Sequence, residues 1–373
     1  MKPLLFIIAL TVSAASTLFS CGAKSDGKLT SGDTLTTESR LLTIVDHGDY
    51  MIADIRNPWT DSLPLLERYV LAPKDYKGPL PDGTVVRTPI ERSVVFSSVH
   101  GGAIDELGTP NAIKGVADGQ YFINPAIVSR IKAGKIADIG NSMSPSTEKI
   151  VDLDPDAILL SPFQNKESGA VTKLGIPVLQ CVDYLESTPL GRAEWIRLLG
   201  ALYGRTDVAD SIFSAVKREY VGLRDSLTLL NYAPVVLTEQ PMPSGEWDVP
   251  AGESYMARIL TDAAAIYPWA GTKGTGSLKL DAPAVLDKAE NADYWLIRSF
   301  GPLSLGSLMA GNPLSSHFKT AATGNIYVCD TSVSPIFDEF PFHPERLLRD
   351  YAAIFHPDLF PGYRLRYFQR IGK

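Results

Sequence analysis

Side chains able to perform acid–base or metal chemistry are present in this chain but scattered along it. The five histidines, at positions 47, 100, 317, 343 and 356, include no pair at the spacing of metal ligands. The sequence contains no Walker phosphate loop, G-x-S-x-G, H-E-x-x-H or C-x-x-C motif. The turn SSVHGGAIDELG lacks the G-x-G-x-x-G spacing of a dinucleotide site. These patterns favour a binding protein over an enzyme, and predict no cofactor and no metal ligands.

Aromatic, amide and hydroxyl side chains occur in the loops that follow the predicted strands. In an open parallel sheet, ligands bind at the carboxyl ends of the strands, where backbone ends and helix starts converge. Aromatic walls with a few polar groups suit a flat or bulky ligand rather than a bare ion. The candidate ligand contacts are Ser98, His100, Asn141, Met143, Phe163, Gln164, Gln240, Trp247, Tyr255, Trp269, Arg298, Phe300 and Ile336, which precedes Phe337 in the chain.

Several of these residues have a structural alternative. Arg298, at the end of a predicted strand, could hold a carboxylate or propionate with two guanidinium nitrogens, or form an internal ion pair. Trp269 could pack within its loop and Met143 could fill the core. His343 and His356 each precede a proline at an end of the last predicted helix, which favours capping over ligand contact.

The elements that must position these loops are apolar strand-like runs alternating with helix-like segments. A hairpin is predicted over residues 42–55, with short strands nearby in ERYVLAP and GTVVRTP. The runs SVVFSS, KIADIG, DAILLSP and PVLQCVDYL then predict parallel strands separated by helices. The same pattern returns in PVVLTEQ, DYWLIRS and NIYVCD, and a helix closes the chain in HPERLLRDYAAIFHPDLFP. The predicted fold class is therefore α/β.

Two helices interrupt the alternation between residues 188 and 227. Thr188 and Pro189 have the types of an N-cap and a first helical residue, and Gly204 suits the end of this helix. With Thr206 as its cap, a second helix continues to Leu227 with apolar residues at helical spacing, a length of ~33 Å. The simplest assembly is two similar α/β lobes joined by one long helix.

The N-terminus has the pattern of an export signal. One lysine precedes an apolar stretch at residues 4–12 and then small residues, which together are too short for a stable membrane span. The following Leu18-Phe19-Ser20-Cys21 resembles the lipobox of bacterial lipoproteins, in which the signal is removed before the cysteine and the cysteine is acylated. Acyl chains on Cys21 would hold the domain at a membrane face. The alternative is an ordinary signal peptide with an incidental cysteine.

These observations predict the domain organisation. Residues 1–20 are a signal peptide, and residues 21–40 are a flexible leash, since large apolar residues are almost absent before Leu41. Residues 41–187 form the N-terminal lobe, 188–230 the connecting helices and 231–373 the C-terminal lobe.

Charge and cysteine content exclude other classes. The net charge of −7 argues against nucleic-acid binding, which favours basic surfaces. Cys181 and Cys329 are the remaining cysteines after Cys21, and each lies in an apolar run of a different predicted half. This placement favours free buried thiols, with a bridge as the alternative.

The order of four segments carries a family resemblance. SVVFSSVHGGAIDELG, KIADIGNSMSPSTEKIVDLDPDAILLS, TPLGRAEWIRLLGALYG and HPERLLRDYAAIFHPDLFP together resemble the periplasmic substrate-binding proteins of ABC importers for ferric siderophores, haem and vitamin B12. The resemblance implies two Rossmann-like lobes bridged by a single long helix, with the ligand between them. It also implies docking to the permease through one acidic residue on each lobe. Glu148 matches the first, whereas the second position holds Pro283, with Asp281 as a nearby substitute.

The resemblance implies a lipid-anchored periplasmic monomer that captures an iron complex, a ferric siderophore or haem, and passes it to an ABC permease and its ATPase. Vitamin B12 is the alternative ligand. An envelope metal-dependent enzyme would require residues such as His100, Asp330 and Asp338 to converge on a metal, and a purely structural lipoprotein would lack a pocket between the lobes.

Overall fold

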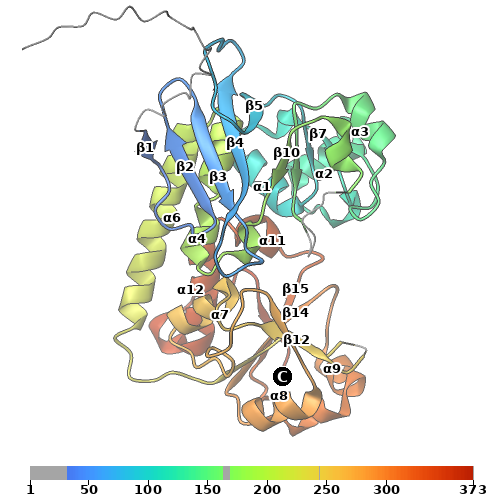
Figure 1. The fold of residues 1–373 in the computed structure, drawn as a ribbon. Helices are drawn as coiled ribbons and strands as arrows, with labels where there is room; N and C mark the ends of the chain where they lie inside the picture. Colours follow the sequence, from blue (N-terminus) through green and yellow to red (C-terminus); the bar gives the residue numbers. More distant parts are fainter. Residues whose placement is uncertain (1–31, 163–168, 243, 373) are drawn as a thin grey trace, which may run out of the picture.

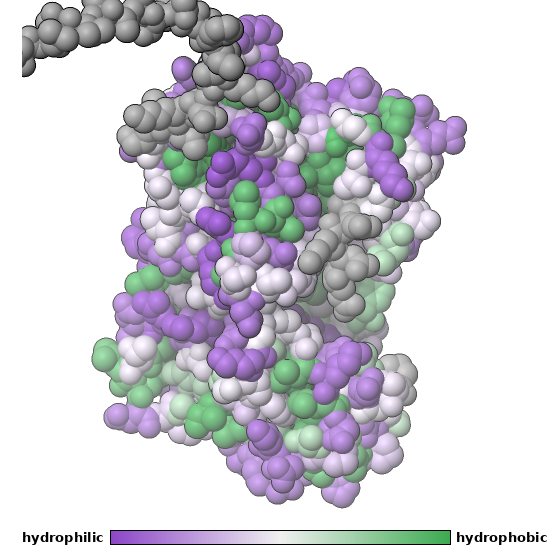
Figure 2. All heavy atoms as spheres, in the orientation of Figure 1, coloured by the Kyte–Doolittle hydropathy of each residue, from purple (hydrophilic) through white to green (hydrophobic). Residues whose placement is uncertain are grey.

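The computed structural model describes residues 32–162, 169–242 and 244–372. These residues form two lobes, each with parallel strands at its centre, and a long helix runs along one side of both (Figure 1). On the face drawn in Figure 2, polar and apolar side chains are interspersed over both lobes. Within the described ranges, no helix combines the length and the apolar character needed to cross a bilayer.

The parallel sheet of the N-terminal lobe has five strands in the order β10-β9-β6-β7-β8. Every pairing in it is parallel, as predicted. Its strands are β6 (Ser93–Val95), β7 (Ile113–Val116), β8 (Ala137–Asp138), β9 (Ala157–Leu160) and β10 (Val178–Gln180). Its helices are α1 (Ser98–Glu106), α2 (Pro125–Lys132) and α3 (Thr147–Leu153). The sequence did not predict β7, because Lys114 and Gly115 interrupt its apolar run.

A second, mostly antiparallel sheet precedes the parallel one. The predicted hairpin is present, with Leu42 opposite Ile55 and Asp46 opposite Met51. The sheet has the order β1-β2-β3-β4-β5, and only its β4–β5 pairing is parallel. The strands are β1 (Asp33–Thr34), β2 (Leu42–Asp46), β3 (Met51–Arg56), β4 (Leu65–Pro73) and β5 (Thr84–Thr88).

The prediction of a flexible leash up to residue 40 is wrong for residues 33–40. The fully buried carboxylate of Glu194 accepts the backbone N–H groups of Thr37, Glu38 and Ser39 at 2.7–3.0 Å. Glu186, also fully buried, accepts those of the next two residues. A carboxylate that receives several N–H groups is strongly bound. These partners lie about 150 positions downstream, so the polar composition of the segment gave no sign of them.

The connecting region matches the prediction except that the first of the two predicted helices is divided. Its parts are α4 (Pro189–Ala193) and α5 (Ile196–Leu202), and the second predicted helix is α6 (Thr206–Leu227). The Thr188 hydroxyl accepts the Gly191 N–H at 2.9 Å as the N-cap of α4, and Gly204 adopts φ +67° after α5. In α6, Thr206 is the first helical residue and Arg205 is the N-cap, so the predicted cap was one residue late.

The C-terminal lobe contains the sheet β11-β14-β15-β16, in which the first three strands are parallel and the last is antiparallel. The strands are β11 (Val236–Thr238), β14 (Tyr294–Ser299), β15 (Ile326–Asp330) and β16 (Gln369–Arg370), with a separate pair β12 (Trp247–Pro250) and β13 (Ser277–Leu280). The helices are α7 (Tyr255–Asp262), α8 (Ala282–Ala289), α9 (Leu305–Gly311), α10 (Lys319–Thr323), α11 (Ile336–Glu339) and α12 (Pro344–Phe355). Cys181 and Cys329 are buried, unpaired and in different lobes.

The two lobes are in direct contact through α1 and α11. A Cβ atom on Gly102 in α1 would lie 2.9 Å from the carbonyl oxygen of Asp338 in α11 and 3.2 Å from its Cα atom. No larger side chain fits there without a backbone shift, so glycine permits the close approach. On the other side of the molecule, α6 packs against α5 and α12, which gives the lobes a second fixed connection.

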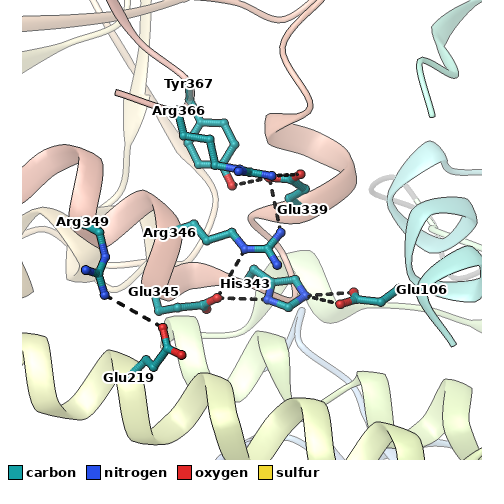
Figure 3. Close-up of polar contacts among 9 residues, drawn as sticks. All are labelled: Glu106, Glu219, Glu339, His343, Glu345, Arg346, Arg349, Arg366 and Tyr367. Atoms are coloured by element: carbon teal, nitrogen blue, oxygen red, sulfur yellow. Dashed lines mark hydrogen bonds and ion pairs between the residues drawn. The ribbon is translucent and has the colours of Figure 1, made fainter. Parts of the chain in front are cut away.

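A chain of charged groups joins the lobes beside this contact (Figure 3). His343 Nε2 lies 2.8 Å from both carboxylate oxygens of Glu106 at the end of α1, and Nδ1 lies 3.0 Å from Glu345 in α12. Arg346 extends the chain to Glu339, which also pairs with Arg366. Burial alone would lower the pKa of His343, but the carboxylates raise it to about 9. His343 is therefore an interlobe imidazolium and not merely a helix cap.

We expect this link to lose strength at alkaline pH. Because the pKa of His343 in the folded protein exceeds its ordinary value of 6.5, its contribution is complete below pH 6.5 and is lost as the pH rises through about 9. The free energy of unfolding of the wild type, measured relative to His343→Gln, should fall by roughly 2–4 kcal/mol over this range. Denaturant unfolding at several pH values measures it, with His317→Gln, an exposed histidine, as the control. A wild-type-minus-variant difference that does not change with pH would contradict the charged link.

Candidate ligand-binding site

The main cavity lies at the carboxyl edge of the parallel sheet in the N-terminal lobe. It has a volume of about 670 Å³, within the range of small-molecule sites. Four adjacent strands end at it, so their loops converge as they do in other open α/β sheets. The lining residues that follow these strands are Ser97 and Ser98 after β6, Asp118 after β7, Ser142 and Met143 after β8, and Ser161 after β9.

Aromatic side chains form part of the cavity wall and reach toward the second lobe. Phe96, Tyr121 and Phe122 line the cavity. Tyr121 is 54% exposed and meets Phe300 of the C-terminal lobe edge to face, with ring centroids 5.7 Å apart. Phe300 follows β14 and is 74% exposed. Large exposed aromatic side chains facing a cavity can gain contacts by binding a bulky ligand.

Two hydrogen bonds fix the loops after β7 and β8 relative to each other. The Asp118 N–H donates to the Gly140 carbonyl at 2.8 Å, and the Asp118 carboxylate accepts the Ser142 N–H at 3.1 Å. Asp118 adopts φ +50°, a conformation that aspartate and asparagine tolerate better than most residues. Asn141 acts similarly within its loop, because its side-chain oxygen accepts the Met143 N–H at 2.8 Å. The cavity wall is therefore largely preformed.

Some predicted ligand contacts lie at this cavity. Ser98 and Met143 line it, with Met143 80% exposed, and Phe300 stands beside it on Tyr121. Their contact with a ligand stays a prediction. Asn141 is next to the lining but supports the loop, and Gln240 is half-buried after β11. The predicted contacts Phe163 and Gln164 lie outside the described residues.

Three predicted contacts are core residues of the C-terminal lobe, and the prediction of ligand contact does not hold for them in this structure. Trp247, Trp269 and Ile336 are buried. Trp247 stacks on Trp295 with ring centroids 5.8 Å apart, and Trp269 meets Tyr267 at 5.6 Å. Their side chains fill the lobe interior, which is the packed-aromatic alternative that the sequence left open for Trp269.

His100 and Tyr255 belong to a buried polar network between the lobes rather than to the cavity wall. His100 Nε2 lies 3.1 Å from the carboxylate of Asp183, which also accepts a hydrogen bond from Arg192 Nε at 2.9 Å. Arg192 donates to the Tyr255 hydroxyl at 2.5 Å. Burial opposes the charged imidazole, but neighbouring Cys181 and Asp183 raise the pKa of His100 to about 10. This arrangement corrects the prediction that His100 contacts the ligand.

Arg298 forms the internal ion pair that was the alternative to ligand binding. Its Nε lies 2.9 Å from Glu239 Oε1, and its Nη2 contacts the same oxygen. Burial opposes the charge of the guanidinium, but Glu239 raises the pKa of Arg298 above its ordinary value. Its positive charge is therefore already compensated within the protein.

Asp118 and Tyr121 line the cavity but were not predicted from the sequence. Both follow β7, the strand that was not predicted, so no site was expected after it. The serine hydroxyls around the cavity were only partly recognised, because serine in loops is common and carries little signal. Among the described residues, no group of three or more histidine, cysteine or acidic side chains has the geometry to hold a metal ion, so His100, Asp330 and Asp338 do not converge.

The predicted docking residues are exposed and lie on different lobes. Glu148 is in the first turn of α3, where a carboxylate is favoured by the helix dipole. Asp281 is the N-cap of α8, and its side chain accepts the Ala284 N–H at 2.8 Å. Both carboxylates face outward and are accessible to a partner.

The fold and the sequence match known proteins. A family model described as periplasmic binding protein matches residues 107–333. An uncharacterized lipoprotein of Methanocaldococcus jannaschii is 26% identical over 297 residues, or 76% of this chain and 69% of the relative.

Two solved structures share the architecture. A periplasmic haem-binding protein from Pseudomonas aeruginosa has a TM-score of 0.59 at 16% identity, over 76% of this chain and 99% of that chain. A protein of an ABC-type Fe³⁺-hydroxamate transport system from Saccharomonospora viridis has a TM-score of 0.58 at 16% identity, over 72% of this chain and 94% of that chain. The family match spans more than half of the sequence and includes the cavity loops that follow β7, β8 and β9. The chain belongs to the periplasmic binding protein family.

Proposed function

We propose that this protein captures an iron complex, a ferric siderophore or haem, in the cleft between its lobes and delivers it to the permease of an ABC importer. The observation that carries the proposal is the cavity of about 670 Å³ at the carboxyl edge of a parallel sheet, with Phe300 of the other lobe against its rim. The haem-binding and Fe³⁺-hydroxamate proteins of the same fold support an iron complex as the ligand class.

The mechanism is complementarity in a preformed site, without a covalent step. Hydrogen bonds through Asp118 and Asn141 hold the cavity loops before a ligand arrives, which lowers the ordering cost of binding. The α6 connection and the α1–α11 contact limit the relative movement of the lobes. Binding therefore involves small adjustments of the rim, such as rotation of Met143 or Phe300, rather than a wide closure.

The ligand class is testable by absorption spectroscopy. The purified protein should gain a visible absorption band on addition of haem or a ferric siderophore, and hold it through gel filtration. Cyanocobalamin, added separately, tests the alternative ligand. If the protein is folded by circular dichroism but retains none of these compounds, the proposed capture of an iron complex is wrong.

We further propose that Cys21 is lipidated and that the protein works on the outer face of a membrane in the cell envelope. Related proteins in Methanocaldococcus jannaschii are named lipoproteins, and Cys21 lies outside the described residues. The Cys21→Ala variant should move from the membrane fraction to the soluble fraction, since the acyl chains supply the membrane affinity. Fractionation followed by immunoblotting measures this, with Cys181→Ala as the control. Equal membrane association of Cys21→Ala and wild type would contradict lipidation.

We propose that Glu148 and Asp281 dock the loaded protein on its permease. Glu148→Ala and Asp281→Asn should leave ligand affinity unchanged but lower uptake several-fold, because an exposed interfacial charge acts mainly on recognition by the partner. Asparagine at position 281 keeps the N-cap of α8 while it removes the charge. Asp152→Ala, exposed in the same helix as Glu148, is the matched control. Wild-type uptake by both docking variants would remove the assignment.

A further inference from the structure

Three cationic side chains, Arg192, Arg298 and His343, are compensated inside the protein. Arg192 pairs with Asp183, and Arg298 pairs with Glu239. His343 is held between two carboxylates. A guanidinium or imidazolium that already has a buried carboxylate partner gains little from an anionic ligand, because binding one would unpair the other.

Asp118, in contrast, lines the main cavity and has no cationic partner among the described residues. It is the one charged side chain among the described residues that line this cavity. Its carboxylate accepts the Ser142 N–H and takes part in none of the ion pairs within the described ranges.

A neighbouring cavity of about 390 Å³ is lined by further carboxylates and begins at Ile123, next to Phe122 of the main cavity. Glu106 pairs there with His343, and Glu339 pairs with Arg346 and Arg366. Asp105 and Asp338, which also line it, take part in no ion pair among the described residues. Burial, together with the charges of Glu339 and Asp105, raises the pKa of Asp338 to about 7. A carboxyl group that retains its proton near neutral pH reports both burial and a negative local potential.

The uncharged part of the main cavity is rich in hydroxyl groups. Serine hydroxyls donate and accept hydrogen bonds without adding charge, which suits hydroxamate and amide groups. These serines come from the loops after three strands and are Ser97, Ser98, Ser142, Ser144 and Ser161.

We infer that the ligand is a ferric hydroxamate complex whose net charge is zero or positive, an inference that rests on the proposed function and narrows it. Hydroxamate groups that fill the coordination sphere of ferric iron cancel its charge, and a chelator ending in a primary amine makes the complex cationic. A ferric complex of catecholates carries a large negative charge, and haem presents propionate carboxylates. Both anionic classes would be repelled by Asp118 and find the nearby arginines occupied.

One turn supplies both groups that recognise an ammonium arm. The Tyr121 N–H donates to the Asp118 carbonyl at 2.9 Å, so the carboxylate and the half-exposed tyrosine ring stand within one tight turn at the cavity. An ammonium group is attracted both by a carboxylate and by an aromatic face. Asp118 therefore favours a ligand that carries a positive charge. The serine and aromatic side chains contact the uncharged part of that ligand.

A matched pair of ligands tests this inference. The purified full-length protein is titrated with a linear ferric trihydroxamate that ends in a primary amine and with the same chelate N-acetylated, by fluorescence quenching. Both should bind, and the amine form should bind roughly threefold to tenfold more tightly, an advantage that shrinks as salt is added. Haem and a ferric tricatecholate should bind more weakly than either.

The variant Asp118→Asn should remove the advantage of the amine form, so that the amine and acetylated chelates bind with equal affinity. Asparagine keeps the hydrogen-bond acceptor for Ser142 and tolerates the positive φ. Asp287→Asn, an exposed position in α8 of the other lobe, should change neither affinity. If Asp118→Asn does not fold, a ratio of the two wild-type affinities that does not change with salt would contradict an electrostatic role for a cavity carboxylate.

The possible results distinguish a wrong ligand charge from a wrong proposed function. Tighter binding of haem or the tricatecholate would overturn the charge assignment and leave the iron-complex proposal intact. Equal affinity of the amine and acetylated chelates at low salt would overturn the role of Asp118. Failure of every iron complex to bind the folded protein would overturn the proposed function itself.

Discussion

Close contact between α1 and α11 is the constraint on which the rest of the structure depends. Helix α1 starts at the main cavity and passes Gly102, where the backbone of α11 comes too near for any side chain. The same helix ends at Glu106, which binds the imidazolium of His343. Helix α1 therefore connects the ligand cavity, the lobe contact and the interlobe ion pairs. Because this contact is close-packed and does not deform continuously, it fixes the position of the second lobe relative to the cavity.

Charge pairing between the lobes has a consequence for ligand recognition. The residues best suited to hold an anion, Arg192 and Arg298, are used to stabilise the fold through Asp183 and Glu239. What remains at the main cavity is hydroxyl groups, aromatic rings, a thioether and the carboxylate of Asp118. Fold stability and ligand specificity are thus coupled, because a cation that forms an internal ion pair is no longer available to bind an anionic ligand.

The N-terminal sheet is joined to the connecting helices by hydrogen bonds. It lies before residue 107, where the family match begins. The buried carboxylates of Glu186, before α4, and Glu194, between α4 and α5, bind the backbone that leads into β2. The sheet is therefore tied to the connecting helices from its first strands, and residues 33–40 belong to the fold although their composition did not suggest it.

The sequence alone determined the element types, the long connecting helix and the family. Periodicity predicted α6 within one residue, Thr188 and Gly204 marked the ends of the preceding helices, and apolar runs marked most parallel strands, since each signal is local. It also predicted that loops after the strands form the site, because strand ends converge in any parallel sheet. Which individual residues line the cavity was not predictable in this way.

Only the tertiary structure decided which polar and aromatic residues remain free at the cleft. Trp247 and Trp269 have the same residue type as a ligand-binding aromatic but are buried, while Tyr121 follows a strand too polar to be recognised. Arg298 has an ionic partner and Asp118 has none among the described residues, and the carboxylate that neutralises Arg298 lies 59 positions away. Burial and charge compensation arise from contacts between distant segments, and for that reason a local reading of residue types could not assign them.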